Sequence, residues 1–251
     1  MPRITPFRLA AVCALAMSLM FTFTVAASAK GLKADLRVVG SGGKVLAEKT
    51  VAGVDTSVKT SPKATCFGPG TGGSGESVEL MGNTAMGLLA SGAKTIPALR
   101  PLSISDSFDF GLALCGIGSS VAKGSSSWYL KINHKSLTVG GEVAKIKAGD
   151  EVLWALAKTE APDYKYPSEL VLTAPRSATA GSAFTVRVWA YDEKGKRTPQ
   201  AGAKVTGAAE PTGADGRTTV TLGKPAKLIA KATGEIPSAR AAVCVGGKCP
   251  K

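Results

Sequence analysis

Few residues of this 251-residue chain could carry catalysis, and the first of them is its one histidine, His134. Hydrolysis by a nucleophile and a base needs an imidazole or a substitute for it. His134 follows a strand-like run, and the chain has neither a Gly-x-Ser-x-Gly motif nor a His-Glu-x-x-His motif. We therefore predict that His134 lies in a turn and that the protein is not an enzyme.

Paired carboxylates are the second possible source of chemistry. The pairs are Asp106 with Asp109, Asp150 with Glu151, and Asp192 with Glu193. A glycosidase needs two facing acids about 5 to 9 Å apart. The last two pairs instead lie in turn-like stretches, where a carboxylate caps backbone amides. Calcium at the first pair is an alternative, but a calcium loop needs denser alternating acids, so we predict no metal site.

The segment 68–73 matches the Gly-x-Gly-x-x-Gly pattern of dinucleotide sites. That chemistry needs the pattern between a strand and a helix. Here Pro69 lies inside it and a loop-like, glycine-rich stretch surrounds it. We interpret the match as accidental and predict no cofactor.

Four cysteines follow the N-terminal segment: Cys66, Cys115, Cys244 and Cys249. An even number in an exported chain favours disulfides, with three possible connectivities. We predict the two local pairs, Cys66–Cys115 and Cys244–Cys249. The alternative is a zinc site, but no Cys-x-x-Cys spacing supports it.

The N-terminal segment predicts export. Arg3 and Arg8 precede an apolar run, Leu9 to Val25, and Ala27-Ser28-Ala29 is a small-residue cleavage motif. We predict a signal peptide over residues 1–29, cleavage after Ala29, and a secreted mature chain without a transmembrane anchor. A retained membrane anchor is the alternative.

The charge of the chain favours anionic surroundings. It has 31 basic and 18 acidic residues, net +13, and +11 without Arg3 and Arg8. Such a charge suits wall polymers, acidic polysaccharide or phospholipid head groups, and solubility is the alternative explanation. Aromatic residues make up only 6%, too few for a base-stacking platform, so we expect no nucleic-acid partner. The expected partner is an envelope or extracellular one, with an anionic polymer as one possibility.

Residues 30–160 are predicted to form a first unit with an α+β fold. A hairpin is predicted from 34–39 and 44–54, a short helix at 83–90, a buried strand at 108–118, and closing strands at 128–132 and 152–156. Trp128 and Tyr129 are adjacent in a strand, so one of them should face solvent, a ligand or a partner. Trp154 is expected in the core.

Three motifs occur in order: Thr84 to Leu89 (TAMGLL), Trp128 to Lys135 (WYLKINHK) and Ile146 to Trp154 (IKAGDEVLW). Together they resemble the transcobalamin-like C-terminal domain, a module of vitamin B12 carriers that also occurs singly in bacterial surface proteins. The resemblance covers roughly 34–156 and implies a β-grasp-like fold, one helix on a mixed sheet. It also implies ligand-facing residues, and these are Trp128, Tyr129, Asn133 and His134.

Residues 161–167 are predicted to form a linker that is stiffened by Pro162 and Pro167. From 168 to 251, apolar and polar residues alternate between glycine turns, which predicts an all-β sandwich. The segments 199–207 (PQAGAKVTG) and 214–222 (ADGRTTVTL) resemble bacterial immunoglobulin-like surface domains. Trp189 is expected in the core of this sandwich.

These features predict a mostly β, secreted, non-enzymatic binding or adhesion protein of the cell envelope. The alternative is a small-molecule carrier that holds a corrinoid-like ligand on the first unit.

Overall fold

The computed structural model describes residues 31–159 and 165–251. The predicted signal peptide, its cleavage site and most of the predicted linker lie outside the described residues. Within the described ranges, no helix is long and apolar enough to cross a membrane.

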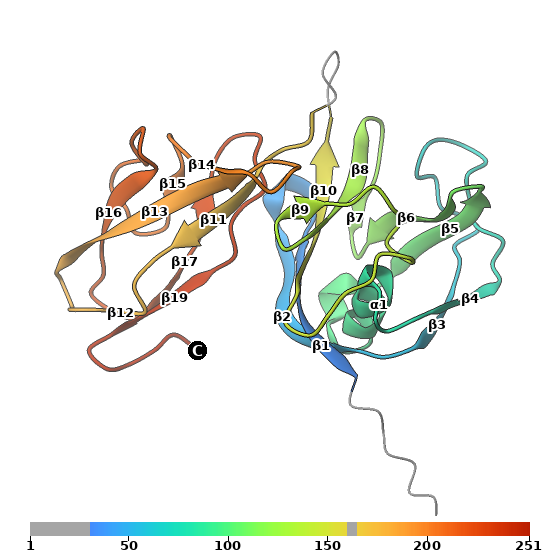
Figure 1. Ribbon diagram of the computed structural model, residues 1–251, viewed down its shortest axis with the longest axis horizontal. Coiled ribbons are helices and arrows are strands. Elements are labelled where there is room, and N and C mark those ends of the chain that lie inside the picture. The colour runs from blue at the N-terminus through green and yellow to red at the C-terminus, as the bar shows by residue number, and fades with distance from the viewer. Residues whose placement is uncertain (1–30, 160–164) are drawn as a thin grey trace, which may run out of the picture. The chain divides into compact units, whose positions relative to one another are not determined.

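The largest sheet has five strands in the order β2 (Val45–Gly53), β1 (Leu32–Val39), β10 (Glu151–Lys158), β8 (Ser126–Ile132) and β9 (Lys135–Ser136) (Figure 1). β1 pairs with β10 in parallel, and the other neighbours are antiparallel. The sheet is therefore mixed, as predicted, and the predicted N-terminal hairpin is the β1–β2 pair.

One α-helix, α1 (Ala85–Thr95), packs on this sheet. The Thr84 hydroxyl accepts a hydrogen bond from the amide of Gly87 at 3.1 Å and so caps the N-terminus of the helix. The helix runs five residues beyond the predicted end, and Ala85 to Ala93 are all buried. Small residues make this possible: a side chain at Gly92 would come within 2.7 Å of Leu36.

Two smaller sheets complete this part of the chain. β3 (Thr56–Lys59) pairs with β4 (Ser77–Leu80), and β5 (Leu102–Phe108) pairs with β6 (Gly111–Ile117), which pairs with β7 (Ser120–Val121). Short 3-10 helices lie at Ser41–Gly43 and Pro97–Leu99. The predicted strand at 108–118 was partly wrong, because Asp109 and Phe110 form a turn between β5 and β6. The Cys66–Cys115 disulfide joins the loop after β3 to β6, as predicted.

The chain from 165 onward is described entirely as strands, turns and loops. One sheet contains β11 (Glu169–Thr173), β13 (Ala183–Tyr191), β14 (Arg197–Pro199) and β16 (Arg217–Thr221). The others are β12 (Ser177–Ala178), β19 (Ala241–Val245) and β17 (Ala226–Leu228), and the pair β15 (Lys204–Val205) with β18 (Ala230–Lys231). These strands enclose one apolar core, and the Cys244–Cys249 disulfide closes the C-terminal turn as predicted.

Both faces of the five-stranded sheet are covered. Side chains such as Leu36 and Trp154 point toward α1. The alternate side chains, among them Tyr129 and Leu153, form a second cluster with Ile236 and Tyr166. Strand β10 is therefore apolar on both sides, which is typical of a central strand with a parallel neighbour.

The structure confirms a mostly β fold with one short helix on a mixed sheet. Among the described residues, every strand pairing stays on one side of the predicted linker. The division into a β-grasp-like and an immunoglobulin-like domain stays a prediction.

Candidate functional site

His134 lies in the two-residue turn that joins β8 to β9. Asn133 and His134 both have left-handed backbones, with φ of 51° and 67°, as the favoured hairpin turn requires. The side-chain amide N–H of Asn133 donates a hydrogen bond to the Asp150 carboxylate at 2.9 Å. The side-chain oxygen of Asn133 accepts a hydrogen bond from the backbone N–H of Glu151 at 3.0 Å. The predicted turn is confirmed, and the polar atoms of Asn133 are used to hold it.

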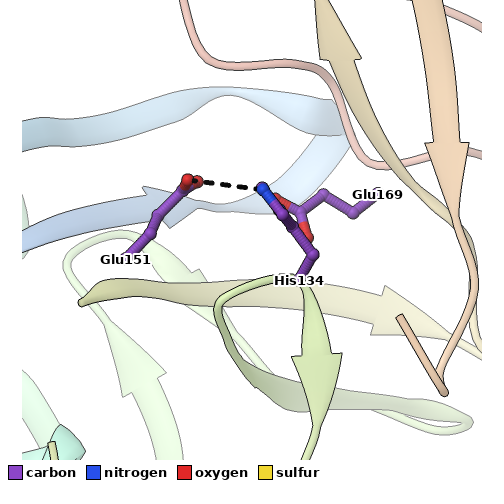
Figure 2. Close-up of side chains that lie close together, drawn as sticks. All are labelled: His134, Glu151 and Glu169. Carbon is purple, nitrogen blue, oxygen red and sulfur yellow. Dashed lines mark hydrogen bonds and ion pairs between the residues drawn. The ribbon is translucent and has the colours of Figure 1, made fainter. Parts of the chain in front are cut away.

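The imidazole of His134 has a carboxylate partner that the sequence did not indicate. Its Nδ1 lies 3.1 Å from Glu169, and its Nε2 lies 3.9 Å from Glu151. Figure 2 shows the polar ends of these three side chains turned toward one another. The ring also packs on Tyr191, with 4.3 Å between ring centroids. The hydrogen bond to Glu169 raises the pKa of His134 despite partial burial.

Glu169 is the centre of a buried ion-pair network. It binds the guanidinium of Arg37, which is also buried, and lies 3.6 Å from the ammonium of Lys131, whose side chain is 0% exposed. Lys131 also donates to the backbone carbonyls of Tyr191 and Asp192 at 3.0 and 2.9 Å.

Burial and charge act in opposite directions on these groups. Burial raises the pKa of Glu169, but the hydrogen bond with His134 and the charges of Arg37, His134 and Lys131 outweigh it and bring that pKa below its ordinary value. Burial lowers the pKa of Lys131, although Glu169 opposes this shift. The network therefore favours an ionised Glu169 next to a protonated His134.

His134, Glu151 and Glu169 could also be considered as metal ligands, because their ligand atoms lie within 4.8 Å of one another. One terminal nitrogen of Arg37 contacts both carboxylates, at 3.3 Å in the case of Glu151. A zinc ion would need carboxylate and imidazole atoms about 2.0 to 2.2 Å from itself. Because a cation would have to compete with the guanidinium, the arrangement is better described as an ion-pair network.

This network predicts a pH-dependent stability. The pKa of His134 is raised above 6.5 in the folded chain, so its contribution is complete below 6.5 and is lost as the pH rises through the folded value. We expect the melting temperature to fall over roughly pH 6 to 8. His134→Gln should remove this slope. Thermal melts of both proteins across that range test this, and an unchanged slope in the variant would assign the dependence to another group.

A cavity of about 560 Å³ lies beside the predicted ligand residues Trp128 and Tyr129, which are among the residues that line it. Its walls also include Trp154, and Phe110 and Val139 contribute apolar side chains that are 65% and 52% exposed. Lys135, Glu193 and Lys194 supply charged groups. The cavity is thus an apolar cleft with a few polar groups, and we call it the Trp128 cleft.

Three phenylalanines gather at this cleft. Phe108 stacks on Phe110 at 4.9 Å between centroids and meets Phe67 edge-on at 5.4 Å. Phe67 and Phe110 both line the cavity. No sequence pattern indicated this group, although Phe67 follows Cys66 directly and the disulfide to Cys115 joins the two segments.

Trp128 and Tyr129 point to opposite faces of the sheet, as predicted. Trp128 is half-buried against the main core, and its indole N–H has no hydrogen-bond partner among the described residues. Tyr129 is buried, stacks on Tyr166 at 4.2 Å between centroids, and forms a hydrogen bond with Ser136. Burial raises the pKa of Tyr129 to about 12. Trp154 lies in the core, as predicted.

Asp106, Asp150 and Asp192 accept hydrogen bonds from backbone amides. Asp150 accepts the amide of Lys147 at 2.7 Å, and Asp192 accepts the amides of Lys194 and Lys196 at 2.9 and 2.8 Å. Hydrogen bonds from the hydroxyl and the amide of Ser74 lower the pKa of Asp106. Within the described residues, Asp106 and Asp109 belong to no group of three or more metal-ligating side chains.

Trp189 was expected in the core, and this prediction was wrong. Val186, Val188 and Ala190 are the residues of β13 that point into the core. Trp189 is only partly buried on the opposite face, where the guanidinium of Arg187 lies 3.7 Å from its ring centroid.

Comparison of the chain with models of known protein families and with curated proteins finds no match. The resemblance to the transcobalamin-like and immunoglobulin-like domains therefore stays a prediction that rests on the motifs in the sequence.

Proposed function

We propose that this protein is a secreted, non-enzymatic binding protein and that its binding site is the Trp128 cleft. The observation that carries the proposal is an apolar cavity of about 560 Å³ with exposed phenylalanines at its wall. Small-molecule sites typically measure about 300 to 1,000 Å³ and are mostly apolar with a few polar groups. Contiguous exposed apolar surface is also typical of binding sites.

The charged residues of the cleft define the ligand further. Lys135 and Lys194 are exposed and Glu193 is the acidic residue that lines it with them, so the net charge of these three is positive. An apolar body with an anionic group fits this combination, because the body covers the phenylalanines while the anion meets the lysines.

Two further features support a non-enzymatic, exported protein. His134, Glu151 and Glu169 do not line the Trp128 cleft, so the strongest cluster of titratable groups among the described residues does not face a ligand there. The disulfides Cys66–Cys115 and Cys244–Cys249 are typical of proteins in oxidising compartments outside the cytosol.

The test uses 8-anilinonaphthalene-1-sulfonate, a dye with an apolar body and one anionic group. We expect saturable one-site binding to the native full chain, and Phe110→Ser/Val139→Ser should weaken it by about thirtyfold, since the two deletions together remove apolar contact worth roughly 2 kcal/mol. The measurement is a fluorescence titration well below the melting temperature, so that partly unfolded protein does not contribute.

The control is Val54→Ser/Met81→Ser, which removes two apolar side chains that are also exposed but do not line the cleft. Equal losses in the two double variants would contradict the proposed site. The melting temperatures of both double variants are also measured. If they match that of the unchanged protein, both variants are folded and the difference between them reports binding.

A corrinoid carrier is the second candidate, because Trp128 and Tyr129 belong both to the cleft and to the residues that the resemblance assigns to the ligand. Tyr129, however, is covered by Tyr166, and Asn133 holds the turn. We therefore expect no saturable binding of cyanocobalamin in an equilibrium dialysis of the full chain. Micromolar or tighter binding would instead make the carrier the leading function.

A further inference from the structure

The outer face of strand β13 carries arginines around a tryptophan. The guanidinium of Arg187 lies 3.7 Å from the centroid of the Trp189 ring, and that of Arg197 lies 4.7 Å from it. Arg217 lies on the neighbouring strand, directly opposite Arg187. We call Arg187, Trp189, Arg197 and Arg217 the arginine–tryptophan face.

Strand register explains why these residues meet. Arg187, Trp189 and Tyr191 alternate with buried residues and therefore share one side of β13. Tyr191 is opposite Arg197 on β14, which makes Arg197 a diagonal neighbour of Trp189. Side chains opposite Trp189 are those of Val171 and Pro199, so an apolar strip crosses the sheet between the arginines.

The positive charge of this face is largely uncompensated. Among the described residues, neither Arg187 nor Arg197 forms an ion pair with a carboxylate, and the Nε–H of Arg187 donates a hydrogen bond to the backbone carbonyl of Asp215 at 3.0 Å. Arg217 lies 3.8 Å from the Asp215 carboxylate, but both side chains are more than half exposed. The interaction free energy of such a solvent-exposed ion pair is small. Glu169 shares this side of the sheet but is already bound by Arg37.

Stacking on Trp189 also prepares the guanidinium groups for recognition. An arginine that stacks on an aromatic ring keeps its planar N–H groups free at the edge, where they match a carboxylate with two parallel hydrogen bonds. Less side-chain entropy is lost on binding because the stack already restricts the rotamers. The neighbouring positive charges also repel each other less once an anion lies between them.

We propose that the arginine–tryptophan face is a binding site for an acidic polysaccharide whose sugar rings carry carboxylates. A uronic acid has a flat C–H face and a carboxylate in one residue, which fits the apolar strip of Val171, Trp189 and Pro199 between the arginines. Charge complementarity selects the anion, and the apolar strip selects a sugar over a polyphosphate. This site is separate from the Trp128 cleft, whose lining contains none of the four residues.

The test is binding of the full chain to immobilised polygalacturonate at physiological salt. Arg187→Gln/Arg197→Gln should weaken binding by about a hundredfold, because each arginine loses a hydrogen bond to a charged group and each such loss is worth about tenfold. Arg197→Gln alone, at an exposed position, should weaken it by a smaller factor. The thermal melt of each variant is compared with that of the unchanged protein, and a melting temperature kept within a few degrees shows that the fold is intact.

The matched control is Arg176→Gln/Lys227→Gln, which removes two exposed charges away from this face. An equal loss in the control would show binding through total charge alone and would overturn the site. Trp189→Leu keeps the apolar strip but removes the stack, and we expect a loss of several-fold as the arginines gain freedom. Equal or tighter binding to polyphosphate would overturn the assignment to a sugar, whereas no binding to neutral dextran is expected.

The same assay separates this proposal from the function of the cleft. Phe110→Ser/Val139→Ser should bind polygalacturonate like the unchanged protein, since the cleft does not contain the arginines. Loss of dye binding with intact polygalacturonate binding would support two separate sites. If the cleft variant lost polygalacturonate binding as well, the polymer would have to occupy the cleft and the proposed face would be wrong.

Discussion

Replacing Glu169 with Gln is expected to lower the free energy of unfolding by about 3 to 5 kcal/mol, the range for breaking a buried ion pair from one side. Glu169 is the carboxylate shared by Arg37, Lys131 and His134. Without its charge, the ammonium of Lys131 stays buried with only carbonyl partners. Urea denaturation followed by circular dichroism measures the effect, and a lower midpoint with an unchanged slope indicates a true loss of stability.

Glu151→Gln is the control for this prediction. The Glu151 side chain is 32% exposed, and it lies 3.3 Å from Arg37 and 3.9 Å from His134. Because solvent screens this pair and Glu169 still compensates Arg37, we expect a loss below about 1 kcal/mol. Similar losses in the two variants would show that burial does not set the strength of the network.

Cys115→Ser should destabilise the protein by about 4 kcal/mol, because the disulfide to Cys66 constrains a long loop in the unfolded chain. The two cysteines are 49 positions apart and both are buried. The same loss should separate Phe67 from its neighbours and weaken dye binding at the Trp128 cleft. Thermal melts and the dye titration measure the two effects on one variant.

Cys249→Ser is the matched substitution at the other disulfide. Cys244 and Cys249 are only 5 positions apart, so the chain-entropy argument gives about 2 kcal/mol, and dye binding should be unchanged. A larger loss from Cys249→Ser than from Cys115→Ser would contradict this account of both bridges.

Much of the fold could be predicted from local patterns. The alternation in β1, β2 and β8 and the Thr84 cap before α1 are strong local signals, and all four elements lie close to where they were expected. β3 and β4 were missed because each has only four residues beside a long glycine-rich loop. Their pairing depends on contacts that a short window of sequence does not contain.

The candidate site could be predicted only in part, because its residues come from distant parts of the sequence. His134 could be placed in a turn, but its partner Glu169 comes 35 positions later, in a strand whose local pattern gives no sign of it. Trp189 was misplaced because alternation defines two faces of a strand without showing which one is buried. In β13 the smaller Val186, Val188 and Ala190 fill the core, and the larger aromatic ring lies outside.

The buried network also constrains how this chain can be inherited. Arg37 and its partner Glu169 are 132 positions apart, so the two charges lie in segments that recombination could easily separate. A rearranged gene that kept only the segment with Arg37 and Lys131 would encode two basic side chains that have lost Glu169 and the backbone carbonyls of the later segment that bind them. Selection against such products would keep the two segments together, even if each descended from a separate ancestral module.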